Sequence, residues 1–189
     1  MREPRYAPNF ATDIMEELMA LPWENHDAPR DEYFMANEKL SYTYGKGRGE
    51  RTYTSAPYSA EVASLQDCIT WYGSRFNMWF GSHYNVCFLN RYDDQKKWLG
   101  WHSDDSPMMD SSHPIAVVSF GVERFINWRP IGHKGVIPKE WTQKLGHRSL
   151  FVMPSGFQET HEHKIPKHSA ECGVRISLTF RRYKEANEY

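Results

Sequence analysis

The chain has 189 residues, with a hydrophobic content of 40% and an aromatic content of 15%. These values exclude an intrinsically disordered chain and are typical of a folded domain that buries a substantial core. The formal net charge of −1 excludes a strongly basic protein, so any contact with nucleic acid would depend on a local basic groove.

The cysteines and the hydropathy indicate the compartment. Cys68, Cys87 and Cys172 are widely separated and form no CxxC pair, which favours a reducing environment over a disulfide framework. Residues 1–10 contain no apolar stretch of the kind found in a secretory leader, and the sequence has no apolar run of about 18 residues, the length of a membrane span. We therefore expect an intracellular, soluble protein of the cytoplasm or nucleus, without a membrane segment. We also expect a monomer with no obligatory protein partner.

Two helices are predicted in the N-terminal half. Residues 12–21 place apolar side chains at helical spacing, with Thr12 and Asp13 as candidates for the N-cap. Residues 59–76 predict a longer helix that Ser59 would cap. The apolar face of this second helix would consist of Val62, Leu65, Ile69 and Tyr72.

Strands dominate the rest of the chain. Residues 40–58 carry alternating tyrosines around a Gly-Arg-Gly sequence, which predicts a β-hairpin with an open loop. Short apolar runs rich in β-branched and aromatic residues follow from about residue 84. The clearest are residues 85–92, 115–121, 124–130, 149–154 and 175–183. We therefore expect an α+β fold with its strands in a sandwich or jelly roll. Because no repeat, low-complexity tract or linker interrupts it, residues 1–189 should form one domain.

Two polar residues at strand-like spacing are the first candidates for chemistry. His102 and Asp104 are two positions apart, so on a strand their side chains would point to the same face. A second histidine from a distant strand would complete the two-histidine, one-carboxylate triad of non-haem Fe(II) oxygenases, which leaves metal positions open. A polar surface turn is the alternative interpretation.

The candidates for the second histidine lie within residues 159–168. His161 and His163 would share a strand face, and His168 lies beyond a proline. Histidines in such a cluster are often only solvated, so this segment alone does not select the ligand.

Two arginines indicate an anionic ligand. Arg175 and Arg181 share one face of a predicted strand whose other face is apolar. Guanidinium groups directed into a core are costly unless each meets an anion. Because arginine binds carboxylates bidentately, a dicarboxylate would satisfy both. Salt bridges or an exposed sheet edge are the alternatives.

The order of these residues resembles the AlkB family of Fe(II)- and 2-oxoglutarate-dependent dioxygenases. The resemblance extends to LNRY before His102, PIAVVSFG after it and HKIPK around the distal histidine. It covers residues 40–183, and LPWE after the first helix looks like the usual start of the domain. It implies a double-stranded β-helix, or jelly roll, at about residues 85–183, with supporting N-terminal helices and a nucleotide-recognition lid at about residues 40–58.

The resemblance also implies a metal site. His102, Asp104 and His163 would bind Fe(II). His163 is preferred to His161 because HKIPK matches the family's His-x-hydrophobic-Pro pattern, and its spacing to Arg175 suits the family.

The implied co-substrate is 2-oxoglutarate. Arg175 would pair with its distal carboxylate, assisted by Tyr92, and Arg181 and Asn90 would lie near its metal-chelating end. The chain departs from the family at Ser177, where asparagine is frequent, and this change should affect co-substrate affinity more than reaction type.

The lid would provide substrate contacts. Tyr44 with Gly45 resembles the family's YG element. Tyr44 and Tyr53 would stack on an unpaired or flipped base, and Arg48 and Arg51 would reach phosphates. Packing within the hairpin is the alternative role for the tyrosines.

A second departure concerns the base. Many relatives that repair nucleic acid carry an acidic residue two positions after the metal aspartate, where this chain has Ser106. The neighbouring Asp105 could contribute instead. This change bears on which base is read, or whether a base is read at all.

The implied reaction is oxidative dealkylation of N-alkylated bases in DNA or RNA. Oxygen and 2-oxoglutarate are consumed, succinate and carbon dioxide form, and a hydroxylated N-methyl group leaves as formaldehyde. The alternatives are the same chemistry on a protein side chain, a lipid or another modified base, and a non-catalytic nucleic-acid-binding module. The sequence does not distinguish DNA from RNA.

Overall fold

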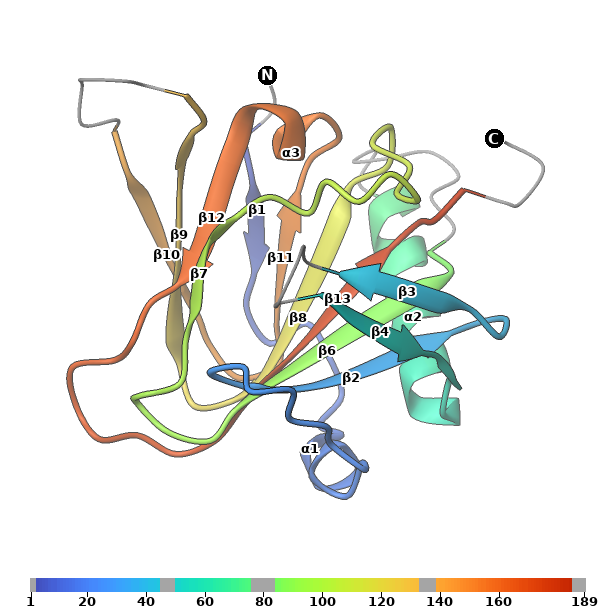
Figure 1. Ribbon diagram of the computed structural model, residues 1–189, viewed down its shortest axis with the longest axis horizontal. Coiled ribbons are helices and arrows are strands. Elements are labelled where there is room, and N and C mark those ends of the chain that lie inside the picture. Colours follow the sequence, from blue (N-terminus) through green and yellow to red (C-terminus); the bar gives the residue numbers. More distant parts are fainter. Residues whose placement is uncertain (1–2, 45–49, 76–83, 133–138, 185–189) are drawn as a thin grey trace.

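A computed structural model describes residues 3–44, 50–75, 84–132 and 139–184, with only the backbone for Tyr42 and Tyr44. A seven-stranded and a four-stranded sheet face one another (Figure 1). In order across it, the larger sheet contains β1 (Arg5–Ala7), β11 (Ser149–Met153), β8 (Ile115–Gly121), β13 (Arg175–Arg181), β6 (Val86–Tyr92), β2 (Asp31–Ala36) and β5 (Ala56–Pro57). The smaller sheet contains β10 (Trp141–Leu145), β9 (Arg124–Pro130), β12 (His161–Ile165) and β7 (Leu99–His102).

Apolar side chains fill the space between the two sheets. Phe88 of β6, Ile126 of β9 and Ile165 of β12 belong to one buried cluster. The short helix α3 (Phe157–Thr160) leads from β11 into β12 and adds the buried Phe157 to this cluster. The predicted double-stranded β-helix, within an α+β fold, is confirmed.

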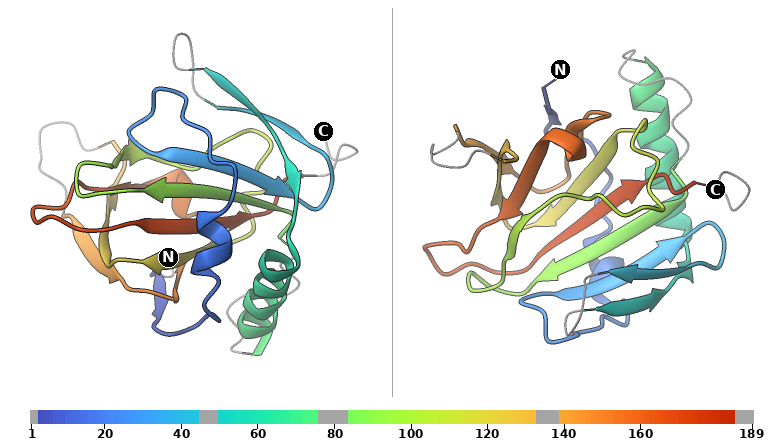
Figure 2. Two further views of the ribbon diagram at one scale, coloured as in Figure 1. Left: turned by 90° about the horizontal axis from the view of Figure 1, so that it is seen from below. Right: turned by 45° about the horizontal axis from the view of Figure 1, so that its top comes forward.

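The two longer helices cover the other face of the larger sheet (Figure 2). Leu18 of α1 (Met15–Met19) and Leu65 of α2 (Ala60–Arg75) pack with Leu178 of β13 in a second buried cluster. The prediction of α2 is confirmed almost to its ends. The backbone N–H of Val62 donates to Oγ of Ser59 at 3.2 Å, as expected for an N-cap.

Helix α1 is shorter than the predicted residues 12–21. The backbone N–H of Met15 donates to Oδ1 of Asp13 at 3.1 Å. At the other end, the Ala20 N–H donates to the Glu17 carbonyl. This i→i+3 bond tightens the last turn and ends the helix before Pro22. No helix in the described residues is long and apolar enough to cross a membrane.

The strands predicted from apolar runs are confirmed as β6, β8, β9, β11 and β13. The larger sheet also takes β1, β2 and β5 from before residue 85, so it extends beyond the predicted limits of the jelly roll. The sequence pattern does not predict β2, because it opens with Asp31 and Glu32, residue types that are depleted in strands. In the structure β2 pairs with β6 along its whole length.

The predicted hairpin is confirmed as the two-stranded sheet of β3 (Ser41–Tyr44) and β4 (Arg51–Thr54). It lies beside β2 (Figures 1 and 2). Its base is held by the Ser55 N–H, which donates to the Leu40 carbonyl at 2.8 Å. The residues at its tip lie outside the described part of the chain.

A row of buried polar residues crosses the larger sheet on the face toward the smaller sheet. Cross-strand pairing gives it the order Ser149, Ser119, Ser177, Asn90 and Glu32. Arg175 lies two positions from Ser177 and so shares this face. The larger sheet therefore provides a polar floor within an otherwise apolar interior.

Candidate metal centre

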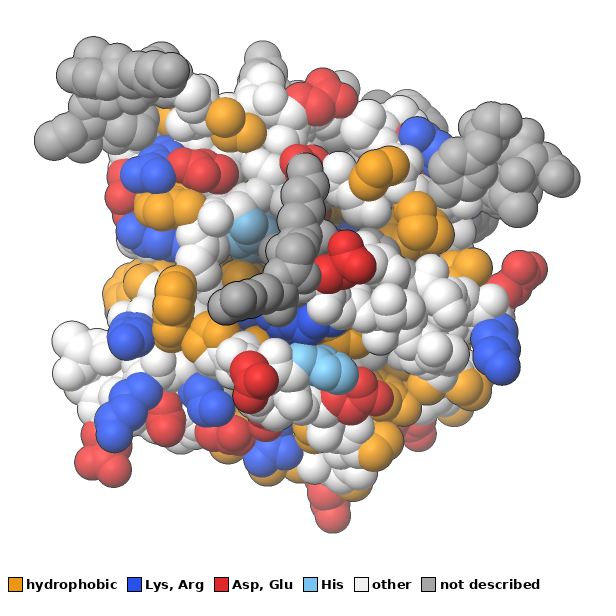
Figure 3. Space-filling view, in the orientation of Figure 1, with side chains coloured by type: hydrophobic (Ala, Val, Ile, Leu, Met, Phe, Trp, Pro, Cys, Tyr) orange, Lys and Arg blue, Asp and Glu red, His pale blue; other side chains and the backbone are white. Residues whose placement is uncertain are grey.

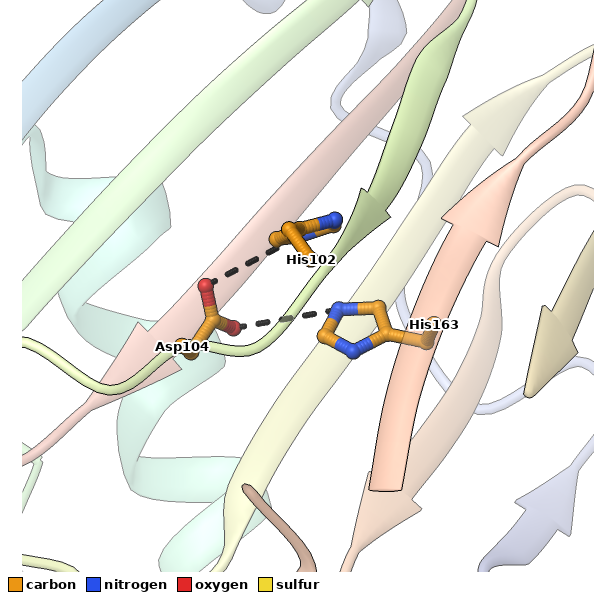
Figure 4. Close-up of side chains that lie close together, drawn as sticks. All are labelled: His102, Asp104 and His163. Atoms are coloured by element: carbon orange, nitrogen blue, oxygen red, sulfur yellow. Dashed lines mark ion pairs between the residues drawn. The ribbon is translucent and has the colours of Figure 1, made fainter. Parts of the chain in front are cut away.

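Three predicted ligands meet between the two sheets (Figure 4). His102 ends β7, Asp104 follows it in the next loop, and His163 lies in β12. Because His163 is the cross-strand neighbour of His102, the pairing of β12 with β7 brings residues 61 positions apart into contact. One ligand atom from each of the three side chains lies within 4.8 Å of the others, close enough to bind one metal ion.

The predicted choice between two histidines agrees with this geometry. His161 lies outside the cluster: its ring stacks on Phe157, with centroids 4.8 Å apart, and its Nδ1 contacts Oγ1 of Thr160 at 2.9 Å. His163 points inward and is buried. Of the two, only His163 is placed to share an ion with Asp104.

Hydrogen bonds position two of the three ligands, His102 and Asp104. Nδ1 of His102 lies 2.9 Å from the Gly100 carbonyl oxygen. Since a carbonyl only accepts, Nδ1 carries the hydrogen and Nε2 keeps its lone pair. The Asp104 N–H donates to Oε1 of Gln158 at 3.0 Å, which fixes the loop that carries the carboxylate.

The charges also suit a divalent cation. Nε2 of each histidine lies 3.9 Å from one oxygen of Asp104. Burial lowers the pKa of His163 to about 3 and also lowers the pKa of His102, so both rings are neutral near pH 7. Burial alone would raise the pKa of Asp104, but Arg181 and the two histidines lower it to about 2. Two neutral imidazoles and one carboxylate fit non-haem Fe(II).

The two predicted arginines lie on β13 beside this cluster. Nη2 of Arg181 donates to Oδ1 of Asp104 at 2.7 Å. Arg175 is completely buried, and its Nη2 donates to Oγ of Ser119 at 2.9 Å. Tyr92 lies beneath the guanidinium, with the ring centroid 5.3 Å from Cζ of Arg175.

The surroundings of Arg175 fit a carboxylate ligand. Its Nε and Nη1 are buried without a hydrogen-bond partner, and no described carboxylate lies within ion-pair distance. Burial lowers the pKa of Arg175 to about 10, so the group keeps its charge at pH 7. A buried cation with two unused donors is the arrangement that one carboxylate of 2-oxoglutarate would satisfy.

A cavity opens beside the metal ligands. Its lining residues are Arg30, Phe88, Asn90, Leu99, His102, Asp104 and Arg181. Asn90 and Arg181 are predicted site residues, whereas sequence analysis misses Arg30. The signal available was the pair Arg30 and Glu32, two charged residues that share a strand face, but no strand is predicted there. Nη2 of Arg30 lies 2.5 Å from Oε1 of Glu32.

The predicted substrate contacts agree less well with the structure. Tyr53 is 3% exposed, its hydroxyl donates to Glu32, and its ring packs edge-on against Phe88. In this structure the ring of Tyr53 is therefore not exposed for stacking on a base, and its contacts agree with the alternative of packing within the hairpin. Nη1 of Arg51 also pairs with Glu32, at 2.8 Å, rather than facing outward for a phosphate.

The remaining residues predicted to contact the substrate are Asp105, Tyr44 and Arg48. Asp105 is exposed and does not line the cavity. The side chain of Tyr44 and all of Arg48 lie outside the described residues. No substrate contact can thus be assigned from the described part of the lid.

Comparisons with known proteins agree with this site. Residues 7–181 match the family described as the 2OG-Fe(II) oxygenase superfamily. The chain is 29% identical over 175 residues to mouse alpha-ketoglutarate-dependent dioxygenase alkB homolog 3, covering 89% of this chain and 60% of the relative. It is also 29% identical over 174 residues to the Arabidopsis thaliana DNA oxidative demethylase ALKBH2, covering 81% of this chain and 52% of that protein. The chain thus spans little more than half the length of these relatives.

A solved structure shares the fold. The structure of OsALKBH1 superposes with a TM-score of 0.66 over 95% of this chain and 97% of the other, at 14% sequence identity. The fold is thus common to proteins of very different sequence. The family match and the named relatives establish that this chain belongs to the 2OG-Fe(II) oxygenase superfamily, within its AlkB family.

Proposed function

We propose that this protein is an Fe(II)- and 2-oxoglutarate-dependent dioxygenase that removes alkyl groups from N-alkylated bases of DNA or RNA. The observation that carries the proposal is the triad His102, Asp104 and His163 beside Arg175, a buried cation with no carboxylate partner among the described residues. The products would be succinate, carbon dioxide, formaldehyde and the dealkylated base.

The side chains have distinct tasks in this reaction. His102 and His163 offer neutral nitrogens, and Asp104 stays ionised because Arg181 lies 2.7 Å away. Fe(II) held by these three residues supplies the activation of oxygen that no protein side chain can provide. Arg175 binds and orients the distal carboxylate of 2-oxoglutarate, since its Nε and Nη1 have no hydrogen-bond partner among the described residues.

A basic and aromatic surface supports nucleic acid as the substrate. Lys and Arg side chains lie over the smaller sheet, interleaved with apolar and acidic ones (Figure 3), and Arg129 and Lys164 also pair with Glu162 and Glu140. Arg129 and Lys164 lie over the ring of Trp101, at 4.0 and 4.2 Å from its centroid, and Lys167 lies 5.9 Å from that of Trp98. Aromatic rings among cations are typical of surfaces that bind single strands. The relatives named above are DNA demethylases or alkB homologues.

Two observations favour a second candidate, the same chemistry on a different substrate. Tyr53 is buried rather than exposed for stacking, and Ser106 stands where an acidic residue is frequent in nucleic-acid-repairing relatives. A protein side chain, a lipid or a differently modified base would then occupy the site.

The test is turnover with defined substrates. The protein is loaded anaerobically with Fe(II) and 2-oxoglutarate, then given oxygen and single-stranded oligonucleotides that carry 1-methyladenine or 3-methylcytosine. Mass spectrometry follows the methyl group while succinate is measured in parallel. We expect demethylation that disappears in His163→Ala and persists in His161→Ala, a matched change two residues away.

The other outcomes separate the candidates. Succinate without demethylation would favour the second candidate. No 2-oxoglutarate turnover with any substrate would refute the enzymatic proposal and favour a non-catalytic nucleic-acid-binding module.

A further inference from the structure

Glu32 is the most enclosed carboxylate near the site. It lies on β2 at the end of the polar row, and its side chain is 0% exposed. Nη2 of Arg30 lies 2.5 Å from its Oε1, and Nη1 of Arg51 lies 2.8 Å from its Oε2. The hydroxyl of Tyr53 also donates to Oε2. Arg51 and Tyr53 thus donate hydrogen bonds to one buried carboxylate, and Arg30 forms an ion pair with it.

These donors come from two separate parts of the molecule. Arg51 and Tyr53 belong to β4 of the hairpin. Arg30 precedes β2, and its Nε donates to Oδ1 of Asn90 at 2.6 Å. Arg30 and Asn90 both line the cavity beside the metal ligands. Glu32 therefore joins the hairpin to the cavity through one carboxylate, with a single arginine between it and Asn90.

The burial of Glu32 makes the two sides interdependent. A buried carboxylate is tolerated only when its partners compensate for the lost water, and removing one partner is strongly destabilising. Motion of the hairpin away from β2 would leave Glu32 with Arg30 alone, which would then be drawn from Asn90. Conversely, a ligand that fixes Arg30 and Asn90 would hold Glu32 in place for Arg51 and Tyr53.

We propose that Glu32 is a positioning residue that couples the β3–β4 hairpin to the co-substrate cavity. Binding of 2-oxoglutarate beside Arg30 and Asn90 stabilises the docked hairpin, and the docked hairpin raises the affinity for 2-oxoglutarate by the same factor, because coupling between two sites is reciprocal. The choice of 2-oxoglutarate as ligand rests on the proposed function. The coupling itself rests on the contacts of Glu32.

Hydrogen exchange measures this coupling without turnover. The protein is loaded with Mn(II) as a stand-in for Fe(II), and exchange of the β4 amides (residues 51–54) is followed by mass spectrometry with and without 2-oxoglutarate. We expect 2-oxoglutarate to slow this exchange in the unaltered protein. In Glu32→Gln the β4 amides should exchange faster and no longer respond to 2-oxoglutarate.

Calorimetry gives the reciprocal measurement. Coupling of the usual size predicts that Glu32→Gln weakens 2-oxoglutarate binding by about 5- to 150-fold. Glu123→Gln is the matched control, since it removes the same charge from an exposed pair with Lys144 and should change neither quantity. Tyr53→Phe removes only the hydroxyl from the hairpin side and should weaken binding in the same direction, although Tyr53 does not line the cavity. This variant carries the test if Glu32→Gln does not fold.

The outcomes are distinguishable. If 2-oxoglutarate binds but leaves β4 exchange unchanged, or if the affinity is unchanged in Glu32→Gln and Tyr53→Phe, the coupling is refuted while the proposed function stands. If the Mn(II)-loaded protein does not bind 2-oxoglutarate at all, both proposals fail.

Discussion

Replacing Arg175 by methionine should separate stability from ligand binding. Methionine has a similar length and no charge, so it keeps most of the packing against Tyr92. Arg175 is 0% exposed, its Nη2 donates to Oγ of Ser119, and its Nε and Nη1 have no hydrogen-bond partner in the part of the chain that the structure describes. In the ligand-free protein this buried cation therefore lowers the free energy of unfolding rather than raising it.

The expected gain follows from the terms that change. Replacing buried ionic groups with apolar residues of similar volume is neutral or stabilising by about 1–4 kcal/mol. The substitution also leaves Oγ of Ser119 without its donor, which costs about 1 kcal/mol. We expect Arg175→Met to raise the free energy of unfolding of the ligand-free protein by about 0–3 kcal/mol. For a chain of this length, that is a rise in Tm of roughly 0–10 °C.

The effect on binding should have the opposite sign. Nε and Nη1 are two donors available to a carboxylate. A hydrogen bond to a charged group contributes about 1.5–3 kcal/mol, so losing both should cost about 3–6 kcal/mol. That corresponds to a decrease in 2-oxoglutarate affinity on the order of 10²- to 10⁴-fold.

Two measurements on the same samples check this reasoning. Thermal unfolding of the metal-free protein gives Tm, and calorimetric titration of the Mn(II)-loaded protein gives the affinity for 2-oxoglutarate. Arg91→Met is the matched control, because Arg91 lies on the neighbouring strand β6, is partly exposed and pairs with Asp93 at 2.7 Å. It should leave binding unchanged.

A clear result would refute the argument. If Arg175→Met lowers Tm strongly in the metal-free protein and binds 2-oxoglutarate as well as the unaltered chain, Arg175 is a structural residue. The carboxylate site would then have to be sought elsewhere in the cavity.

Three further predictions concern the metal, pH and one glycine. Mn(II) at 100 times its dissociation constant should stabilise the protein by about 2.7 kcal/mol, or roughly 5–10 °C in Tm; a similar shift in His163→Ala would exclude that ligand. Without metal, the folded His163 has a pKa of about 3 against 6.5 for a free histidine, so the unfolded state binds the proton first. The contribution of neutral His163 to the free energy of unfolding is complete above pH 6.5 and decreases by about 1.4 kcal/mol for each pH unit as the pH falls toward 3. A Tm that does not change between pH 6.5 and 5 would contradict this. Gly121→Ala would place Cβ 2.2 Å from the Val174 carbonyl oxygen at a φ of +86°, so we expect a loss of at least about 2–3 kcal/mol in denaturant unfolding. Gly156→Ala, at a φ of +74° with nothing within 4 Å, should lose only about 1 kcal/mol; equal losses would refute the steric explanation.

Local sequence patterns predict those helices and strands whose hydrophobicity directly reflects their burial. The strands β6, β8, β11 and β13 are nearly all buried, so each is a continuous apolar run. Helix α2 shows its buried face at regular spacing. The candidate metal residues were also visible, because His102 with Asp104 and the HKIPK sequence carry recognisable spacing.

Other parts depend on contacts between distant segments. Glu32 favours a loop when its sequence neighbours alone are considered. It is accommodated in β2 by partners that include Arg51 and Tyr53, 19 and 21 residues later. The alternating sequence of the hairpin places Tyr53 on one face of its strand. It does not show that this face packs against Phe88 and Glu32. Arg30 was missed for the same reason, since its role depends on Asn90, 60 residues away.

The shortest strand has a consequence for the integrity of the protein. β1 is only three residues long, yet it covers the outer edge of β11, whose five residues are all buried. The N–H groups of Phe10 and Ala11 secure it by donating to the Arg148 carbonyl. Without this segment, the apolar β11 would present unpaired backbone groups at the edge of the sheet, a template for pairing with another chain. Proteolytic removal of the first ten residues would thus expose an edge that can pair with another chain, and we expect self-association while the candidate metal ligands of β7, β12 and the loop after β7 keep their places.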